Sequence, residues 1–417
     1  MTAPTVLLAP DKFKGTATAA QAAAALARGI TSTAPHARLI RCPIADGGDG
    51  TLDAALAAGY GEHRTTVTGP TGAPRTARFA LGPDAATAVV ELAETVGLQA
   101  LPGGDLAART ASTRGLGELI LAAVHHGART VVVGLGGSAS TDLGAGLLQG
   151  LGARLMTTDG YPIDPGLDGL ASLATVDLQP ARTALAGVRV VIASDVTSPL
   201  LGPYGAAAVF GPQKGLAPTE ISEADAILEH AAHLLDPTDT HRDQAGAGAA
   251  GGTGFALHLL EAENRSGADV VLELAGFDAH LEQAQLVITG EGALDEQTLQ
   301  GKGPAEVARR AAARGIPVIA VAGAVLLGEG TLREAGIGRS WDLVSRATSS
   351  ADAMARTADL LEDVGREIGR WITEDGIDRV AHLDHVAHPD HVAHPDRAPH
   401  PGQADSTTRG TTRGTLP

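Results

Sequence analysis

A glycine-rich segment, residues 134–146, constrains the fold of this chain more than any other stretch. It reads Gly-Leu-Gly-Gly-Ser-Ala-Ser-Thr-Asp-Leu-Gly-Ala-Gly and follows residues 130–133, whose β-branched side chains predict a buried strand. The Leu-, Ala- and Gly-rich residues 143–155 predict a helix. A chain that turns this sharply needs backbone conformations with positive φ, which glycine adopts readily. The segment therefore predicts a strand–loop–helix unit of an α/β fold.

The predicted helix start in this segment is a candidate anion site. Ser138, Ser140, Thr141 and Asp142 supply hydroxyls and a carboxylate there. Unpaired N–H groups and the positive end of the helix dipole attract phosphate or carboxylate groups. The alternative is a tight turn in which Thr141 or Asp142 caps the helix. The segment alone leaves both interpretations open.

The beginning of the chain has a similar construction. Residues 5–9 predict a short apolar strand, and Asp11, Lys12 and Lys14 follow before a helix that we expect to be capped by Thr16 or Thr18 and to end at Gly29. In open α/β sheets, ligands bind at the carboxyl ends of the strands. Two lysines beside a helix start suit a phosphate group, and solvated surface lysines are the alternative.

The next predicted strand, residues 38–42, leads into a second acidic turn. Asp46 and Asp49 flank two glycines there, before a helix predicted over residues 52–58. Carboxylate oxygens are the usual protein ligands of Mg²⁺, so a metal or hydroxyl site is one interpretation. Ordinary turn chemistry, with Asp49 as an N-cap, is the other.

Candidate groups recur further along the chain. Asp195 follows the strand predicted over residues 188–193, where a carboxylate can bind a metal or accept a hydroxyl proton. Lys214, in a glycine-rich loop, is another candidate cation. Residues 110–115 include Arg114, which could hold a substrate carboxylate. An ordinary helix N-terminus explains residues 110–115 equally well.

A βαβ unit is predicted over residues 286–321. Its first strand, residues 286–289, is followed by an acidic glycine turn with Glu291 and Asp295, and Lys302 stands at the next helix start. This resembles a phosphate cradle, although the spacing of a Walker motif is absent. Residues 351–371 then predict one amphipathic helix with Met354 on its apolar side.

Composition narrows the classes of function. A chain of 417 residues is long for one compact domain, so we expect two. The net charge of −17 argues against nucleic acid or an anionic membrane as the main partner. Cys42 is the only cysteine, which fits a reducing compartment. Without an apolar run of about 18 residues or a signal-like N-terminus, a cytoplasmic location is expected.

The last residues form a low-complexity tail. Residues 385–390 and 391–396 repeat His-Val-Ala-His-Pro-Asp, and residues 407–414 repeat Thr-Thr-Arg-Gly. A histidine-rich tail can bind Zn²⁺ or Ni²⁺ loosely. The small apolar content of residues 376–417 instead predicts disorder.

Together, glycine turns with Asp, Glu or Lys at several strand ends predict phosphoryl transfer to a small acid. Residues 9–15, 43–51, 134–146, 195–204, 210–215 and 289–303 also resemble, in order, the signature blocks of the bacterial glycerate kinases of glyoxylate and glucarate catabolism. The resemblance covers about residues 5–372. It departs from the family pattern at Lys12, where serine is more common.

The resemblance implies ATP-dependent phosphorylation of D-glycerate to 2- or 3-phosphoglycerate, with Mg²⁺ as a cofactor. It also implies two α/β domains: a flavodoxin-like parallel-sheet domain from residues 1–60 and 282–375, and an inserted α/β domain, residues 61–281. No nucleic-acid or membrane partner is implied, and a homodimer is compatible with it.

The resemblance carries over to specific candidate residues. Lys14 and Lys302 would contact phosphate or carboxylate groups, and Asp46 would lie near Mg²⁺ or the glycerate hydroxyls. Asp195 would act as a base. Asp195 and Asp49 are the candidate metal ligands. The remaining binding candidates are Asp11, Lys12, Gly136, Gly137, Ser138, Asp142, Lys214, Glu291 and Asp295.

Two alternatives stay open at this point. The run Gly-Leu-Gly-Gly-Ser-Ala also resembles the phosphate loop of the galactokinase and mevalonate kinase superfamily, which has another fold and other substrates. A non-catalytic sensor that binds a sugar acid is the second alternative, and it would bind glycerate without consuming ATP.

Overall fold

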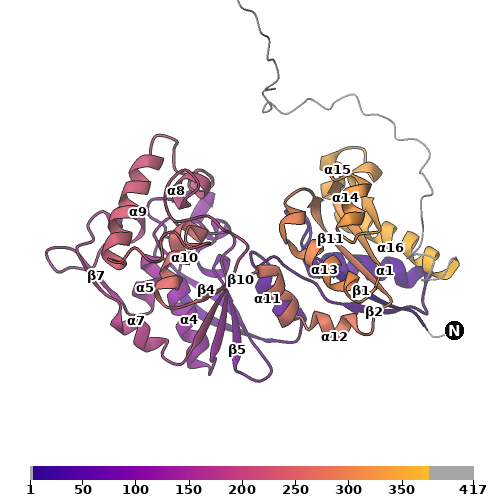
Figure 1. Ribbon diagram of the computed structural model, residues 1–417, viewed down its shortest axis with the longest axis horizontal. Coiled ribbons are helices and arrows are strands. Elements are labelled where there is room, and N and C mark those ends of the chain that lie inside the picture. Colours follow the sequence, from indigo (N-terminus) through magenta and orange to yellow (C-terminus); the bar gives the residue numbers. More distant parts are fainter. Residues whose placement is uncertain (1–2, 375–417) are drawn as a thin grey trace, which may run out of the picture. The chain divides into compact units, whose positions relative to one another are not determined.

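The computed structural model describes residues 3–374, which form two larger β-sheets, a short hairpin and the helices around them (Figure 1). The segment predicted to be a disordered tail, residues 376–417, lies outside the described residues. Within residues 3–374, every helix is too short or too polar to cross a bilayer.

The first sheet is parallel throughout and has the strand order β2–β1–β11–β12–β13. Counted along the chain within this sheet, that order is 2-1-3-4-5, which is the flavodoxin-like arrangement. The predicted fold class is therefore confirmed. The five strands are β1 (Thr5–Pro10), β2 (Arg38–Arg41), β11 (Leu286–Leu294), β12 (Val318–Val325) and β13 (Arg339–Asp342).

Alternating side chains of β1 build the two sides of this sheet. Val6 and Leu8 pack in a cluster with α1 (Ala19–Thr33) and α16 (Thr357–Glu374). Leu7 and Ala9 belong to the cluster on the opposite face, which includes residues of α12 (Phe277–Leu281) and α13 (Gly303–Ala312). A strand with both faces covered reads as a continuous apolar run, as residues 5–9 do.

The second sheet has the order β10–β9–β6–β5–β4–β3. Its strands from β10 to β5 are parallel, and β4 and β3 add antiparallel pairs at one edge. Its core includes α4 (Arg114–His125) and α9 (Ile221–Leu235). The strands are β3 (Gly61–Thr68), β4 (Pro74–Leu81), β5 (Thr87–Glu91), β6 (Thr130–Gly134), β9 (Arg189–Ala193) and β10 (Glu263–Arg265).

The remaining elements are short. They are α2 (Thr51–Ala57), α3 (Ala93–Val96), α5 (Ala145–Gly150), β7 (Arg154–Met156), α6 (Gly166–Leu170), β8 (Thr175–Asp177), α7 (Gln179–Ala184), α8 (Ala206–Phe210), α10 (Ala249–Leu259), α11 (Gly267–Leu274), α14 (Glu329–Glu334) and α15 (Ser350–Ala355). Helix α2 packs on the second sheet, and α11 contributes Val270 to that same cluster and Leu272 to the core of the first sheet. The domain boundaries near residues 60 and 281 remain a prediction.

Two helix ends differ from the sequence-based expectation. Helix α1 has the expected N-cap, Thr18, but it runs through Gly29 to Thr33. Gly29 is a contact residue there, because a Cβ at this position would collide with the carbonyl oxygen of Glu362 on α16. The helix predicted over residues 143–155 covers only Ala145–Gly150, and Gly152, with φ of 102°, turns the chain into β7.

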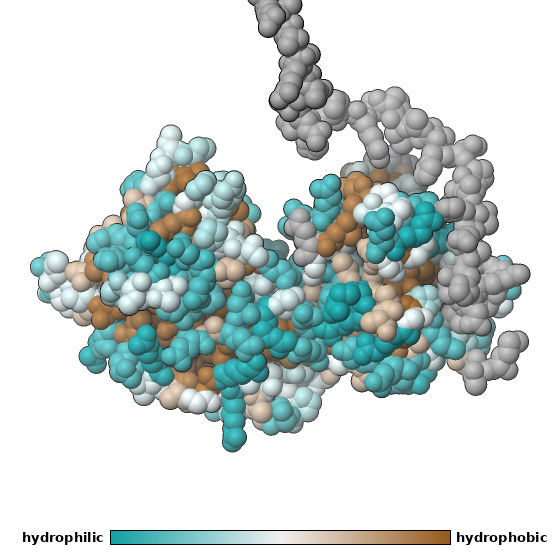
Figure 2. All heavy atoms as spheres, in the orientation of Figure 1, coloured by the Kyte–Doolittle hydropathy of each residue, from teal (hydrophilic) through white to brown (hydrophobic). Residues whose placement is uncertain are grey.

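Two further expectations were wrong because distant segments decide the local structure. The acidic turn predicted after residue 289 is part of β11, since Glu291 and Ala293 pair with Ala322 and Ala324 of β12. The single helix predicted over residues 351–371 is two helices, α15 and α16, separated at Arg356. Figure 2 shows hydrophilic side chains over much of the visible surface, with hydrophobic ones among them.

Candidate active site

A cavity of about 660 Å³ lies at the carboxyl edge of the first sheet. The sheet order reverses between β1 and β11, and ligands of open α/β sheets bind at such a point. Pro10 and Gly290 are paired there, so the side chains that follow these strands meet. The cavity brings together these predicted residues: Asp11, Lys12, Lys14, Asp46, Asp49, Gly136, Gly137, Glu291, Asp295 and Lys302.

Lys12 and Asp46 form the central ion pair of the cavity. The Lys12 Nζ lies 3.1 Å from Asp46 Oδ1 and 3.7 Å from Asp11 Oδ1. Burial is the largest single effect and opposes ionisation of Asp46, but the Lys12 charge, the Lys12 hydrogen bond and the backbone hydrogen bonds together outweigh it and lower the pKa of Asp46. Asp46 therefore stays ionised at neutral pH and can accept a hydrogen bond from a substrate hydroxyl.

Two other carboxyls of the cavity are shifted the other way. Burial raises the pKa of Asp11 to about 7, with a further contribution from the Asp46 charge, although its carboxylate accepts the Lys12 N–H at 2.5 Å. Burial also raises the pKa of Glu291, whose Oε1 accepts the Thr298 hydroxyl at 2.7 Å. A cluster of shifted carboxyls with a lysine in a cavity is typical of a catalytic site.

Two loops from different strand ends close one side of the cavity. Gly137 has φ of 69°, and a Cβ on it would collide with Asp49 Oδ1. A Cβ on Gly136 would meet the Gly48 backbone at 2.5 Å. Only glycines allow this approach. The Oδ1 atom of Asp49 is buried and has no hydrogen-bond partner within residues 3–374.

Sequence reasoning gave no role to the carboxylate that fixes the Asp49 loop. Glu91, at the end of β5, accepts the N–H groups of Leu52 at 3.0 Å and Gly50 at 3.3 Å. Its burial raises its pKa to about 7. The sequence signal was a glutamate ending a buried strand, which resembles an ordinary strand end.

Comparisons with known proteins identify the family. The model of the Glycerate kinase family matches residues 6–373. The chain belongs to the glycerate kinase family. Glycerate kinase of Bacillus subtilis (strain 168) is 40% identical over 367 residues, which cover 87% of this chain and 96% of that protein. Glycerate 2-kinase of Escherichia coli (strain K12) is 39% identical over 337 residues, covering 80% and 88%.

A solved structure supports the same relationship within the glycerate kinase family. The crystal structure of a protein from Salmonella typhimurium LT2, described as a candidate glycerate kinase 2, matches with a TM-score of 0.78 and 36% sequence identity. The match covers 89% of this chain and 99% of that chain. The comparisons favour neither a galactokinase-type kinase nor a sugar-acid sensor.

Three predicted ligand-binding residues of this glycerate kinase family member lie outside the cavity lining. Asp142 is fully buried and its carboxylate accepts four hydrogen bonds, from Thr113 N, Thr113 Oγ1, Gly144 N and Gly146 N. Two of these N–H groups belong to the start of α5. The Asp142 carboxylate therefore fills the predicted anion site. Thr113 lies in the segment that was predicted to hold a substrate carboxylate, and it binds the Asp142 carboxylate instead.

Lys214 and Ser138 are also engaged inside the protein. The Lys214 Nζ donates to the Ser140 carbonyl at 2.5 Å and lies 3.5 Å from Ser138 Oγ. Only 1% of Lys214 is exposed, and this burial lowers its pKa to about 7. Both side chains fix the 138–142 loop and do not line the cavity.

Asp195 lies near the cavity without lining it. Its Oδ1 accepts the Gly267 N–H at 3.0 Å, and a Cβ on Gly267 would collide with the Asp46 carbonyl oxygen. Partial desolvation raises the pKa of Asp195, with a smaller contribution from the Asp46 charge. Asp195 is thus linked to Asp46 through the backbone at Gly267.

The cavity also contains apolar residues that sequence reasoning assigned elsewhere. Met354 was expected on the apolar face of one long helix, but it lies on α15, is 55% exposed and lines the cavity beside Val344 and Ala353. No local signal marked the break between α15 and α16.

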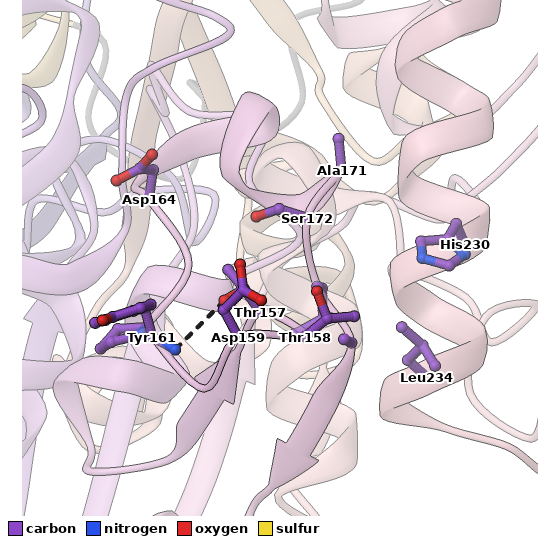
Figure 3. Close-up of a pocket in the computed structure, with 12 residues that line it drawn as sticks. Thr157, Thr158, Asp159, Tyr161, Asp164, Ala171, Ser172, His230 and Leu234 are labelled. Atoms are coloured by element: carbon purple, nitrogen blue, oxygen red, sulfur yellow. Dashed lines mark hydrogen bonds between the residues drawn. The ribbon is translucent and has the colours of Figure 1, made fainter.

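A second cavity, of about 850 Å³, lies beside the β7–β8 hairpin (Figure 3). Figure 3 shows His230 and Leu234 on one helix, α9, and Thr158 and Asp159 on the turn after β7. It contains none of the predicted site residues.

Proposed function

We propose that this chain transfers the γ-phosphoryl group of ATP to a hydroxyl of D-glycerate, giving phosphoglycerate and ADP. The observation that carries the proposal is the cavity at the β1–β11 switch point, where Lys12, Lys14 and Lys302 meet a set of carboxylates. Family membership supplies the reaction class. Such a transfer is catalysed by positioning and charge stabilisation, for which lysines and fixed carboxylates are suited.

The lysines divide into two groups in this proposal. Lys12 is committed to Asp46, whereas the Lys14 side chain has no ion pair or hydrogen bond within the described residues. Lys302 precedes α13 and donates to Gln297 at 2.9 Å. Lys14 and Lys302 are therefore the cations that can turn to an incoming phosphate.

The carboxylates would serve the acceptor. An ionised Asp46, oriented by Lys12, accepts the hydrogen bond of the attacking hydroxyl and receives its proton as the phosphoryl group is transferred. Asp195, the other candidate base, would help to position Asp46, because its carboxylate accepts the Gly267 N–H and the Gly267 backbone packs against Asp46. The backbone N–H groups of Gly136 and Gly137 border the same end of the cavity and suit the glycerate carboxylate.

The residues present fit a nucleotide-bound Mg²⁺. Residues 3–374 contain no group of three or more acidic, His or Cys side chains arranged to hold a metal. Mg²⁺ in kinases is usually held by one or two carboxylates together with phosphates and water, so a dedicated cage is not required. The buried, unpaired Asp49 Oδ1 would hold it there. Mg²⁺ would neutralise charge that develops on the phosphates.

The test is ADP release from ATP and Mg²⁺ in the presence of D-glycerate, with L-glycerate and glycolate as controls. We expect turnover that is specific for D-glycerate. The name of the Escherichia coli relative favours 2-phosphoglycerate, and identification of the isomer checks this. Folded protein that releases no ADP with D-glycerate would refute the proposal.

A further inference from the structure

The walls of the cavity differ in chemistry. The lysines and carboxylates of the proposed reaction line one part. The other part is formed by Ala324 near the end of β12, Leu343 and Val344 just after β13, and Ala353 and Met354 in the last turn of α15. None of the lining residues from these segments is charged. We call these five residues the apolar wall.

Met354 is the most unusual member of the apolar wall. Its side chain is 55% exposed, although it lies in a concave site beside other apolar residues. Figure 2 shows hydrophobic side chains at the surface in the region that Figure 1 labels α14 and α15. An isolated exposed hydrophobic residue on a convex surface is ordinary, but an exposed methionine among apolar residues that line a cavity is typical of a ligand surface.

The chemistry of the apolar wall selects among the parts of the two substrates. Glycerate carries a carboxylate and two hydroxyls on three carbons, and triphosphate is highly charged, so neither gains from an uncharged surface. The base of ATP is a flat aromatic ring. A flexible, polarisable methionine makes favourable contacts with aromatic rings.

The apolar wall also borders the uncommitted cation. A Cβ on Gly15 would lie 4.0 Å from Met354 Cε, so the turn that carries Lys14 adjoins Met354. A ligand that covers Met354 with an aromatic ring can therefore direct an attached phosphate chain toward Lys14. A three-carbon acid alone would also leave much of a cavity of about 660 Å³ unfilled.

We propose that the adenine ring of ATP packs on Met354, Val344 and Ala353, with its phosphates directed to Lys14 and Lys302. Glycerate then occupies the opposite end, near Asp46, Gly136 and Gly137. This inference rests on the proposed function, since it assigns the two substrates of that reaction to the two ends of one cavity.

The first experiment is the steady-state kinetics of Met354→Ala. We expect the KM for ATP to rise about tenfold as the ring loses its contact, while the KM for D-glycerate stays within about twofold. Leu326→Ala is the matched control, because Leu326 is 66% exposed and follows β12 without lining the cavity. That variant should leave both KM values unchanged.

A second measurement separates the base from the phosphates. Inorganic triphosphate has no ring, so its inhibition constant against ATP should be the same for Met354→Ala and the parent protein. An equal loss of triphosphate affinity would overturn the proposal, because Met354 would then act on the phosphates or on the structure. A rise in the glycerate KM alone would overturn it too, by assigning the wall to the acceptor.

Calorimetry with a non-hydrolysable ATP analogue, without acceptor, keeps this inference distinct from the proposed function. Affinity that Met354→Ala weakens, in a protein that does not turn over D-glycerate, would refute the function and retain the base site. If Met354→Ala turns over D-glycerate normally and its KM for ATP is unchanged, the proposed function stands and the adenine site at Met354 is refuted.

Discussion

Two strand ends of this protein look alike in sequence and differ in structure. The segment after β1, with Asp11, Lys12 and Lys14, and the segment after β6, with Ser138 and Asp142, both join a strand to a helix through polar residues. The first lines a cavity of about 660 Å³. In the second segment, Ser138 and Asp142 are buried, and the Asp142 side chain is 0% exposed.

The difference shows that a strand–loop–helix sequence able to bind an anion does not reveal whether that anion is a ligand or a carboxylate of the protein itself. The start of α5 attracts negative charge as its sequence predicts. Asp142 supplies that charge from within the chain, and Lys214 fixes the same loop from the other side. The loop thereby becomes a rigid support whose glycines, Gly136 and Gly137, reach the cavity. The segment after β2, with Asp46, lines the same cavity as the segment after β1. We therefore expect mutations in these two open segments to impair turnover and mutations in the closed loop to impair stability.

The largest expected effect is on turnover in Asp46→Asn. An amide cannot receive the proton of the attacking hydroxyl, so kcat should fall by about 10²–10⁴-fold. The melting temperature should stay close to that of the parent, because Asp46 is partly exposed and its ion pair with Lys12 adds little stability. The measurement is ADP release at saturating substrates.

The control for Asp46→Asn is Asp159→Asn, in the second cavity, which should keep full turnover. A kcat of Asp46→Asn within threefold of the parent value would remove Asp46 from the chemistry and weaken the contrast between the open segments and the closed loop.

The next effect is on stability, in Asp142→Ala. Four buried donors lose their acceptor, and we expect the free energy of unfolding to fall by about 3–5 kcal/mol. Urea denaturation measures this. Below the unfolding transition, kcat per folded molecule should change much less than in Asp46→Asn. Parent-like stability combined with loss of turnover would show that the closed loop acts directly on substrates.

The smallest expected effect is a pH dependence of the free energy of unfolding that arises from Lys214. Its pKa of about 7 in the folded protein lies below the ordinary value of 10.5, so between these pH values the unfolded chain binds more protons. Stability from this group therefore rises with pH from about 7 to 10 and is constant below that interval. We expect a gain on the order of 1–3 kcal/mol, which Lys214→Met should abolish.

Denaturation of both proteins at pH 7, 8.5 and 10 measures the effect of Lys214. Asp142 is the charged group that opposes the shift, so in Asp142→Asn the pKa of Lys214 should fall further and the rise in stability should begin below pH 7, which an added measurement at pH 6 would detect. A parent protein whose stability falls steadily over this interval, in step with Lys214→Met, would contradict the assignment of a buried neutral amine.

The strands were predictable because their signals are local. Residues 5–9, 130–133, 188–193 and 286–289 are apolar or β-branched runs, and each contains or overlaps a strand of the structure. The ends of helices were less predictable. Gly29 resembles a helix stop in sequence, yet it lies inside α1 because α16, more than 300 residues away, needs the space of its missing side chain.

The candidate site was predictable to the extent that it follows strand ends. Asp11, Asp46, Glu291 and Lys302 lie at one cavity because parallel strands bring their carboxyl ends to one edge. Met354 was missed because its neighbours in sequence complete an amphipathic pattern, and the break at Arg356 leaves no mark in that pattern.

By itself, the sequence determined the parallel α/β class, the family and the strand ends at which charged groups stand, because these follow from neighbouring residues and their order. Only the tertiary structure decided which of those charged groups face a cavity and which face each other. Asp142 and Asp46 illustrate the reason: both follow a strand, and burial by residues distant in sequence makes the first a structural acceptor and leaves the second available to a ligand.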